Sequence, residues 1–289
     1  MKLPVAVLIP CFNSGRYLKA TIESALTQTY TPLEVIAIND GSRDETHTIL
    51  QSYAPTIRIL SHPDNANLGQ AASLNLGVRS TTAEFIAFLD SDDIWYPDKI
   101  EKQVKILKMH ADIGLVYANG LAIDEEGKTL YGLFPDFFQE RNVEGAILLN
   151  CYIRVPSSIM VRKTILEKAG LFRTDLQATD HDMWIRMSEL TKFHYLPEIL
   201  MAYRVHPGQQ SLRRRQWEDG FSILREACQR HPYGVDLRRK RLAVLYYRLG
   251  EYDWDHGLHL RALCYFLLAG LIDPLRAVQV LFGLIKDAK

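Results

Sequence analysis

The 289-residue sequence lacks a net charge, because 34 lysine and arginine residues balance 34 aspartate and glutamate residues. A protein that mainly coats nucleic acid usually carries a clear basic excess, so the balance argues against that class and we expect no nucleic-acid partner. Disorder is excluded as well, since 47% of the residues are hydrophobic and only 24% are charged. The composition predicts a folded protein with a packed core.

Cysteine is scarce, and long apolar runs are absent. The four cysteines, Cys11, Cys151, Cys228 and Cys264, lie far apart and without the paired spacing of a metal site. They indicate reduced thiols, so we expect a cytoplasmic protein. No stretch reaches the roughly 20 apolar residues that a membrane span needs, and the first residues lack the pattern of a signal peptide.

Short apolar runs alternate with helical patterns over the first third of the chain. Strands are predicted at 5–9, 33–38, 57–60 and 85–89, with helices between them and after Pro97, and two later strands at 193–196 and 199–205. The early strands are continuous apolar runs, which is typical of a parallel sheet covered by helices on both faces.

From about residue 213 the pattern becomes helical. We therefore predict two domains, an α/β domain over 1–210 and an α-helical appendage over 211–289. The appendage carries much apolar surface from Leu258 onward. Three interpretations stay open for these helices: they pack together or onto the first domain, they form a homodimer, or they contact a membrane surface.

Acidic residues follow the predicted strands at one edge of the sheet. Asp40 follows the second strand, and the run Asp90–Asp93 follows the fourth. Ligands of open parallel sheets bind beyond the carboxyl ends of the strands, so this edge is the expected site. Carboxylates packed so closely repel one another, and a divalent cation that also binds diphosphate oxygens would offset the repulsion. Alternatively, the acids cap the helix that Pro97 opens.

Three residues near this edge have both a ligand-binding and an ordinary interpretation. Asp40 could accept a hydrogen bond from a ring N–H of a base, or it could form a simple Asp-Gly turn. Phe12 could stack on that base or pack against the protein. Pro10 could serve only to direct the exit of the chain from the first strand.

Several separate segments together resemble family-2 glycosyltransferases with a GT-A fold. These segments are LIPCFNSGRYLKATIESALTQTY, VIAINDGSRDET, NLGQAASLNLG and FIAFLDSDD, in this order within about residues 3–210. The resemblance implies an α/β fold, Rossmann-like, with a mostly parallel central sheet, helices on both faces and the C-terminal helical segment added. In that family the first segments bind the nucleotide, usually UDP, and an Asp-x-Asp motif holds Mn²⁺ or Mg²⁺.

Carried over to this sequence, the resemblance implies a nucleotide site. Pro10, Phe12 and Asp40 would hold the base and the ribose. Asn67 and Gly69 match the start of the third segment, although a turn at the entry of a helix is an equally ordinary role for them.

The resemblance also implies a metal site. Asp90 would reach the ribose or the metal–water shell, and Asp92 would ligate the metal. In the segment YRVHPGQQS, His206 is a third metal ligand, a contact to the diphosphate or an ordinary loop residue; imidazole beside carboxylates favours Mn²⁺ over Mg²⁺. Arg204 and the run Arg213–Arg215 could neutralise phosphate or form a solvated face.

The segment ATDHDMWIRM resembles the Glu-Asp-x-Asp-φ-Trp pattern of the family, in which an acid deprotonates the acceptor. Asp180 occupies the position of that acid, and Thr179 stands where the family usually has Glu. An inverting transfer needs such a base within reach of the acceptor hydroxyl. The alternative is that Asp180 and Asp182 open the following helix, and we assign that capping role to Asp182.

The sequence thus predicts a metal-dependent inverting glycosyltransferase that moves a sugar from a nucleotide-sugar donor, UDP-linked by expectation, to an acceptor hydroxyl. The acceptor would be a carbohydrate or a lipid-linked molecule in polysaccharide or cell-surface glycan synthesis. We expect a cytoplasmic protein, with association to the inner face of the membrane as an open option. Two alternatives stay open, a degenerate non-catalytic nucleotide-binding or adaptor protein and a nucleotidyltransferase. A nicotinamide oxidoreductase is disfavoured, because no GxGxxG turn follows the first strand.

Overall fold

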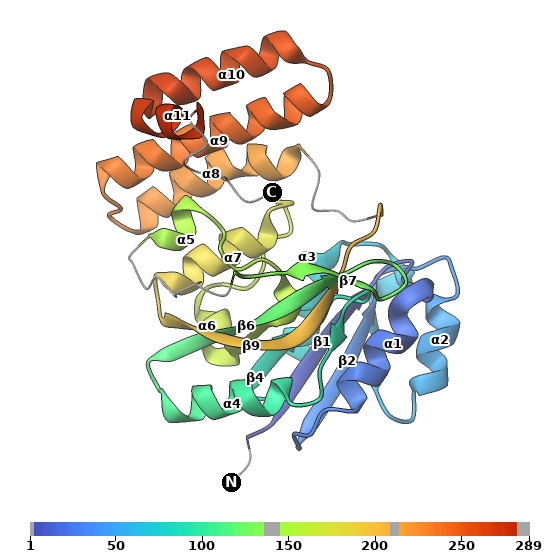
Figure 1. Cartoon of the computed structure of the whole chain (residues 1–289). Coiled ribbons are helices and arrows are strands. Elements are labelled where there is room, and N and C mark those ends of the chain that lie inside the picture. The colour runs from blue at the N-terminus through green and yellow to red at the C-terminus, as the bar shows by residue number, and fades with distance from the viewer. Residues whose placement is uncertain (1–2, 136–144, 209–213, 282–289) are drawn as a thin grey trace. The chain divides into compact units, whose positions relative to one another are not determined.

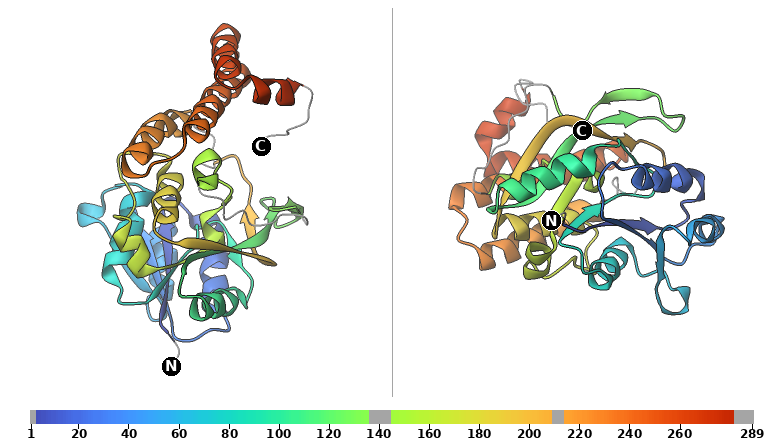
Figure 2. Two further views of the ribbon diagram at one scale, coloured as in Figure 1. Left: turned by 90° about the vertical axis from the view of Figure 1, so that its left-hand side faces the viewer. Right: turned by 90° about the horizontal axis from the view of Figure 1, so that it is seen from below.

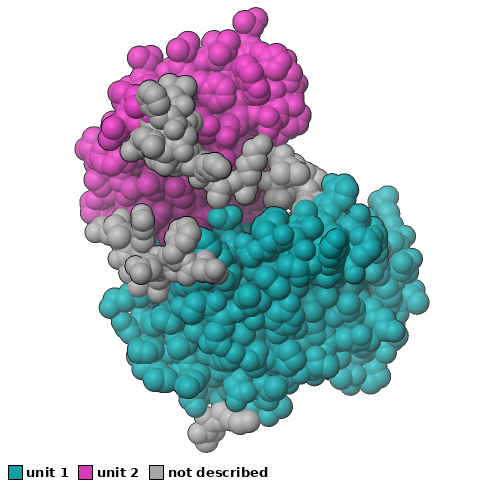
Figure 3. All heavy atoms as spheres, viewed as in Figure 1, with its two compact units in different colours: residues 1–142, 153–174, 186–209 teal, residues 143–152, 175–185, 210–289 magenta. Residues whose placement is uncertain are grey.

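The computed structural model describes residues 3–135, 145–208 and 214–281. The chain divides into two compact units, which Figure 3 colours separately. Unit 1 comprises residues 1–142, 153–174 and 186–209, and unit 2 comprises residues 143–152, 175–185 and 210–289. The predicted boundary between residues 210 and 211 lies outside the described residues, so the division into domains at that point stays a prediction.

Unit 1 is built on a central sheet (Figure 1). Its strands are β1 (Val5–Cys11), β2 (Leu33–Asn39), β3 (Arg58–Ser61), β4 (Phe85–Phe88), β5 (Ile94–Trp95), β6 (Ile113–Ile123), β7 (Thr129–Gly132), β8 (Ile159–Arg162) and β9 (Lys192–Arg204). They lie in the order β3-β2-β1-β4-β8-β6-β9-β5, and β7 pairs with β6.

The sheet is mixed. Strands β3, β2, β1 and β4 are parallel to one another, as the continuous apolar runs predicted. Strand β8 is antiparallel to both of its neighbours, and β5 is antiparallel to β9, whereas β6 and β9 are parallel. The expected parallel pairing is therefore found in the first four strands and between β6 and β9, and the other pairs are antiparallel.

Helices cover both faces of this sheet. The helices of unit 1 are α1 (Gly15–Leu26), α2 (Thr46–Tyr53), α3 (Gln70–Ser80), α4 (Lys99–Met109) and α6 (Lys163–Lys168), with short 3-10 turns at Pro63–Asn65 and Pro156–Ser158. Figure 2 shows α1 and α4 on one face and α3 and α6 on the other. This double coverage explains why residues 5–9 of β1 are all fully buried.

Unit 2 is helical in its described part. Its helices are α5 (Ala146–Leu149), the first part of α7 (Thr179–Ser188), α8 (Arg215–Arg230), α9 (Val235–Asp255), α10 (His259–Ile272) and α11 (Pro274–Leu281). Helix α9 packs against α8, α10 and α5. The predicted C-terminal helical segment is thereby confirmed. No helix within the described ranges is both long and apolar enough to cross a membrane.

Candidate active site

The carboxyl ends of β1 and β2 lie side by side. The parallel register pairs Cys11 with Asn39, and the backbone N–H of Asp40 donates to Cys11 O at 2.8 Å. Strand β1 therefore runs through Pro10 to Cys11, two residues beyond the strand that the sequence predicted. Pro10 lies in the ladder beside Ile38 rather than at the exit of the chain. Phe12 and Asp40 consequently emerge at the same edge of the sheet.

Asp40 holds the loop that leads into α3. Its carboxylate oxygens accept backbone N–H groups, Oδ1 from Leu68 at 2.7 Å and Oδ2 from Gly69 at 2.9 Å. The Asn67 side chain donates to Asp40 O at 3.1 Å, and Gly69 has a φ of +89°, which favours glycine. The structure thus brings together Asp40, Asn67 and Gly69. Oδ1 of Asp40 also lies 3.5 Å from His62 Nε2, whereas Oδ2 keeps a lone pair for a further donor.

Phe12 exposes 44% of its surface, so packing does not account for it. The next residue, Asn13, has a φ of +50° and is fixed from both sides. Its N–H donates to Ser42 Oγ at 3.1 Å, and its Oδ1 accepts from Arg43 N at 2.8 Å. The loop is thus held by its polar contacts, which leaves the ring of Phe12 available for stacking.

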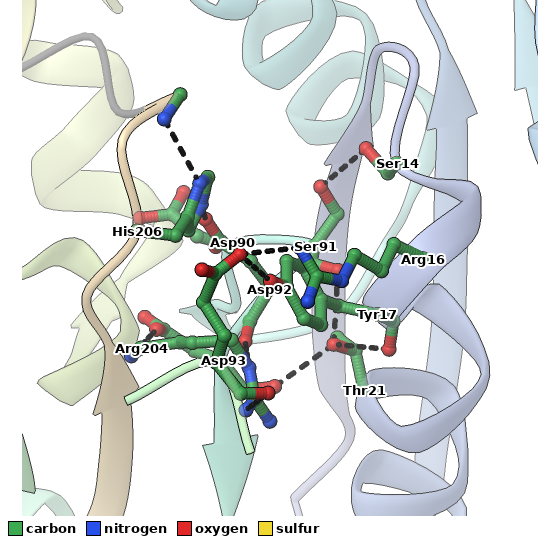
Figure 4. A network of polar contacts seen from close by, with 12 residues as sticks. Ser14, Arg16, Tyr17, Thr21, Asp90, Ser91, Asp92, Asp93, Arg204 and His206 are labelled. Carbon is green, nitrogen blue, oxygen red and sulfur yellow. Dashed lines mark hydrogen bonds and ion pairs between the residues drawn. The ribbon is translucent and has the colours of Figure 1, made fainter. Parts of the chain in front are cut away.

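The acidic run after β4 separates into residues with different surroundings (Figure 4). Asp90 accepts from Gln70 Nε2 at 2.8 Å, while its own N–H donates to Ser157 Oγ at 2.9 Å. Asp92 Oδ2 lies 2.9 Å from His206 Nε2. Asp92 and His206 are partly exposed, so both can contact a ligand.

Asp93 has a different role from its neighbours. It is fully buried, and its carboxylate accepts from the Arg204 backbone N–H at 2.9 Å and from the Ser157 hydroxyl. Burial, together with the charges of Asp92 and Asp90, raises the pKa of Asp93 well above its usual range. Asp93 therefore ties the acidic run to β9 and does not face a ligand.

His206 is placed by two further contacts. Its Nδ1 accepts the N–H of Gly208 at 3.2 Å, which leaves Nε2 to donate to the carboxylate of Asp92. The imidazole also lies against the ring of Tyr17, with 5.4 Å between the centroids. Residue 206 is thereby brought to an acid 114 positions earlier in the chain, and its role as a metal ligand stays a prediction.

Arg204 braces the acidic run. Its Nε donates to Asp92 O, and its Nη1 donates to Asp124 O and Glu125 O, each at 3.0 Å. The guanidinium also lies 4.7 Å from the centre of the Tyr17 ring, and only 5% of the residue is exposed. Carbonyl oxygens thus hold the guanidinium of Arg204 inside the protein, and a contact between Arg204 and phosphate stays a prediction.

The arginine run expected to meet phosphate also lies partly in internal contacts. Arg213 lies outside the described residues. Arg214 pairs with Asp253 at 3.2 Å and with Glu218, both within unit 2. Arg215 donates to Asp175 O at 3.4 Å.

Sequence reasoning missed the residues that support the acidic run. Thr21 Oγ1 donates to Ser91 O at 3.0 Å and to Asp93 O at 2.9 Å, and the hydroxyls of Ser14 and Ser91 are 2.7 Å apart. One signal was present, since Thr21 is a polar residue on the buried face of α1 beside Leu18. The position of that hydroxyl under the acidic run depends on the packing of α1.

Within unit 2, Asp180 is the second residue of α7. It is half-buried, and burial raises its pKa although the Thr179 hydroxyl, 3.3 Å from Oδ1, acts in the opposite direction. Asp182 is fully buried inside the first turn, and its N–H donates to Ala178 O. The predicted capping role of Asp182 is wrong, because the helix begins three residues before it.

These features can be set against known proteins. A family model described as Glycosyl transferase family 2 matches residues 6–170. An uncharacterized glycosyltransferase of Rickettsia prowazekii is 34% identical over 210 residues, which are 71% of this chain and 65% of that relative. The chain thus spans about two thirds of the length of the relative. The chain belongs to glycosyl transferase family 2.

Solved structures agree on the fold. The match to TarS 1-349 of S. aureus in complex with UDP covers 95% of this chain and 83% of the TarS chain, with a TM-score of 0.69 and 18% sequence identity. The mannosyltransferase PcManGT of Pyrobaculum calidifontis, in complex with GDP-Man and Mn²⁺, covers 99% and 82%, with a TM-score of 0.63 and 18% identity. The GT-A fold implied by the sequence segments is confirmed.

Proposed function

We propose that this chain is a metal-dependent, inverting glycosyltransferase that uses a UDP-linked sugar. The observation that carries the proposal is the contact between the Asp92 carboxylate and the His206 imidazole, next to Asp90, at the edge of the sheet where parallel strands end. Membership of the family supports sugar transfer, and a neighbour of the same fold contains UDP.

A divalent cation is part of the proposal. Within residues 3–135, 145–208 and 214–281, no group of three or more His, Cys, Asp and Glu side chains is arranged to hold a metal ion. Asp92 and His206 nevertheless offer a carboxylate and an imidazole, a donor pair that Mn²⁺ accepts, with Asp90 close by. When bound there, the cation would offset the negative charge of the diphosphate. The neighbour that contains Mn²⁺ supports this choice over Mg²⁺.

The chain's own residues have separate proposed roles. Phe12 stacks on the base, Pro10 and Asp40 hold the base and ribose, and Asn67 and Gly69 shape the loop around them. Asp180 accepts the proton of the acceptor hydroxyl, whose oxygen bonds to the anomeric carbon. The bond from that carbon to the diphosphate breaks on the opposite face, and the leaving oxygen keeps the electron pair.

The test is nucleotide binding with and without metal. We expect UDP or a UDP sugar to raise the melting temperature of the full chain more in the presence of Mn²⁺ than in its absence, whereas GDP and dTDP sugars have smaller effects. Absence of any metal-linked stabilisation by any of these nucleotides would contradict the proposal. Formation of UTP and sugar 1-phosphate from the UDP sugar and added pyrophosphate would indicate a nucleotidyltransferase, and binding without turnover would indicate an adaptor protein.

The acceptor is proposed to be a carbohydrate or lipid-linked hydroxyl. Helices α10 and α11 expose apolar side chains, among them Leu260, Leu267, Leu271 and Leu275, each at least 67% exposed. Such a surface suits either a homodimer or peripheral contact with a membrane. Light scattering and flotation with anionic liposomes distinguish the two, and a monomer that stays with the soluble fraction would exclude both.

A further inference from the structure

The start of α7, which carries Asp180, is held by a side chain of α8. Oδ2 of Asp219 accepts the backbone N–H of Gln177 at 2.5 Å and that of Ala178 at 3.2 Å. Both N–H groups belong to the two residues that precede Thr179, the first residue of α7, and a carboxylate at this point also suits the positive end of the helix dipole. Asp219 is only 9% exposed, so α8 caps α7 from inside the protein.

The residue after Asp180 is fixed as well. Nε2 of His181 lies 2.7 Å from Ile147 O, and because a carbonyl only accepts, Nε2 carries the hydrogen. The lone pair of Nδ1 faces Arg241 Nη2 at 3.5 Å. Burial and the charge of Arg241 lower the pKa of His181 to about 3, so the imidazole is neutral at physiological pH. Both ring nitrogens therefore have defined partners.

Arg241 connects several segments of unit 2. It is 3% exposed, and its Nη1 donates to Leu149 O at 3.0 Å, at the end of α5. Burial lowers its pKa to about 10, so it stays charged at neutral pH. A Cβ on Gly220 of α8 would lie 2.3 Å from the Leu245 side chain, so a larger residue there would require Leu245 to shift. One buried arginine on α9 thus touches both α5 and α7.

We propose that Asp219 and Arg241 are positioning residues for Asp180, so that α8 and α9 hold the base in place. The inference rests on the function proposed above for Asp180. A general base must lie within hydrogen-bond reach of its hydroxyl, and a displacement of about 1 Å can lower the rate roughly 100-fold. Neither residue is among the proposed donor contacts, so we expect their loss to lower turnover and to leave donor affinity unchanged.

The first experiment compares Asp219→Asn with Asp219→Leu in the full chain. Asparagine keeps an oxygen that can accept both N–H groups, whereas leucine does not. We expect Asp219→Leu to lower kcat about 10- to 100-fold with an unchanged KM for the donor, and Asp219→Asn to retain most of the turnover. The matched control is Asp236→Asn, which removes an exposed carboxylate from α9 and should leave kcat unchanged. Equal losses in Asn and Leu variants would overturn the inference.

The second experiment compares Arg241→Lys and Arg241→Gln with Lys240→Gln, which removes the neighbouring, exposed charge. Lysine can reach one of the two partners but not both, so its kcat should fall less than that of the glutamine variant. Lys240→Gln should match the unsubstituted protein. Full turnover in Arg241→Gln would exclude the positioning role of this residue.

A readout without turnover separates this inference from the proposed function. In hydrogen–deuterium exchange, the amides of residues 177–182 should exchange faster in Asp219→Leu than in the unsubstituted protein or in Asp236→Asn. Unchanged exchange in a folded Asp219→Leu variant would overturn the inference even if sugar transfer is confirmed. If the unsubstituted chain transfers no sugar, the proposed function fails while the exchange result still decides how α7 is held. Should Asp219→Leu not fold, the Asn and Arg241→Lys variants decide.

Discussion

Asp253 in unit 2 and Asp92 in unit 1 are acids in opposite electrostatic surroundings. Asp253 is fully buried, and its carboxylate accepts from Arg214 Nε at 3.2 Å, from Arg261 Nη2 at 2.7 Å and from Arg261 Nε. Asp92 lies beside Asp90 and Asp93, and the side chain paired with its carboxylate is a histidine. One carboxylate is compensated by two cations, and the other is crowded by like charges.

The difference shows which acids serve stability and which keep charge for a ligand. Burial alone would raise the pKa of Asp253, but hydrogen bonds and charges from Arg261 and Arg214 outweigh it, and the pKa is lowered. In unit 1, burial and the neighbouring acids raise the pKa of Asp93. Asp93 is thereby drawn into the interior, whereas the partly exposed carboxylate of Asp92 can contact a cation.

The largest expected effect is on turnover, for the substitution of Asp180, whose carboxylate accepts a hydrogen bond from the Thr179 hydroxyl. Asp180→Asn should lower turnover by about 10²- to 10⁴-fold, because general-base catalysis contributes that much, while donor binding stays unchanged. Since burial raises the pKa of Asp180, the rate should fall with decreasing pH at higher values than for an ordinary aspartate. The measurements are kcat against pH and calorimetry with the donor. Retained turnover in Asp180→Asn would remove it as the base.

The second-largest effect is expected on stability, for the substitution of Asp253, the acid compensated by two arginines. Asp253→Asn should lower the free energy of unfolding by about 2 kcal/mol, because its charge-assisted hydrogen bonds from Arg214 and Arg261 weaken, while both arginines stay partly exposed and Arg214 keeps Glu218. Urea unfolding measures the loss, and the folded variant should bind the donor with unchanged affinity. Asp236→Asn, in an exposed pair, serves as the control and should unfold like the unsubstituted protein.

The stabilisation by Asp253 also has a predicted pH dependence. A carboxyl whose pKa is lower in the folded state stabilises the protein above its unfolded pKa of about 3.9. This contribution disappears as the pH falls through the folded pKa. The unfolding curves of Asp253→Asn and the unsubstituted protein should therefore converge in strong acid, and a constant difference at every pH would contradict the ion-pair explanation.

Asp92→Asn should have the opposite profile. Removing one acid from a crowded run relieves repulsion, so the melting temperature without metal should stay the same or rise. Mn²⁺-linked donor binding should weaken by at least about 10- to 100-fold, the range seen when only the residues that support metal ligands are altered. Calorimetry with and without Mn²⁺ measures both the melting temperature and the affinity for the donor. If Asp92→Asn lowered the melting temperature and left Mn²⁺-linked donor binding unchanged, Asp92 would serve stability, as Asp253 does, and the proposed difference between the two acids would be contradicted.

The smallest effect is expected at Phe12. Phe12→Ala should weaken binding of the nucleotide by about 1 kcal/mol, the lower end for stacking of an aromatic side chain on a base. The melting temperature should not change, because the ring is 44% exposed. Equal affinities for UDP in the two proteins would show that Phe12 does not contact the base.

Much of the fold could be predicted where local pattern and tertiary role agree. The strands expected at 33–38 and 85–89 match β2 and β4 to within a residue. The strands expected at 193–196 and 199–205 form one strand, β9, because Pro197 and Glu198 bulge while the pairing with β6 continues. In the sequence, Pro197 interrupts the apolar pattern and therefore indicates the end of a strand. In the structure, β6 pairs with β9 on both sides of the proline.

The sequence was sufficient for the early parallel strands, the acids that follow them and the helical end, since each depends on periodicity or on neighbours along the chain. Tertiary structure was needed to pair Asp92 with His206, to draw Asp93 into the interior and to place Asp219 at the start of α7. These partners are separated by dozens of residues, and no local pattern encodes which distant side chain meets a given carboxylate. The role of each acid follows from the partner that packing provides, and residue type alone does not specify it.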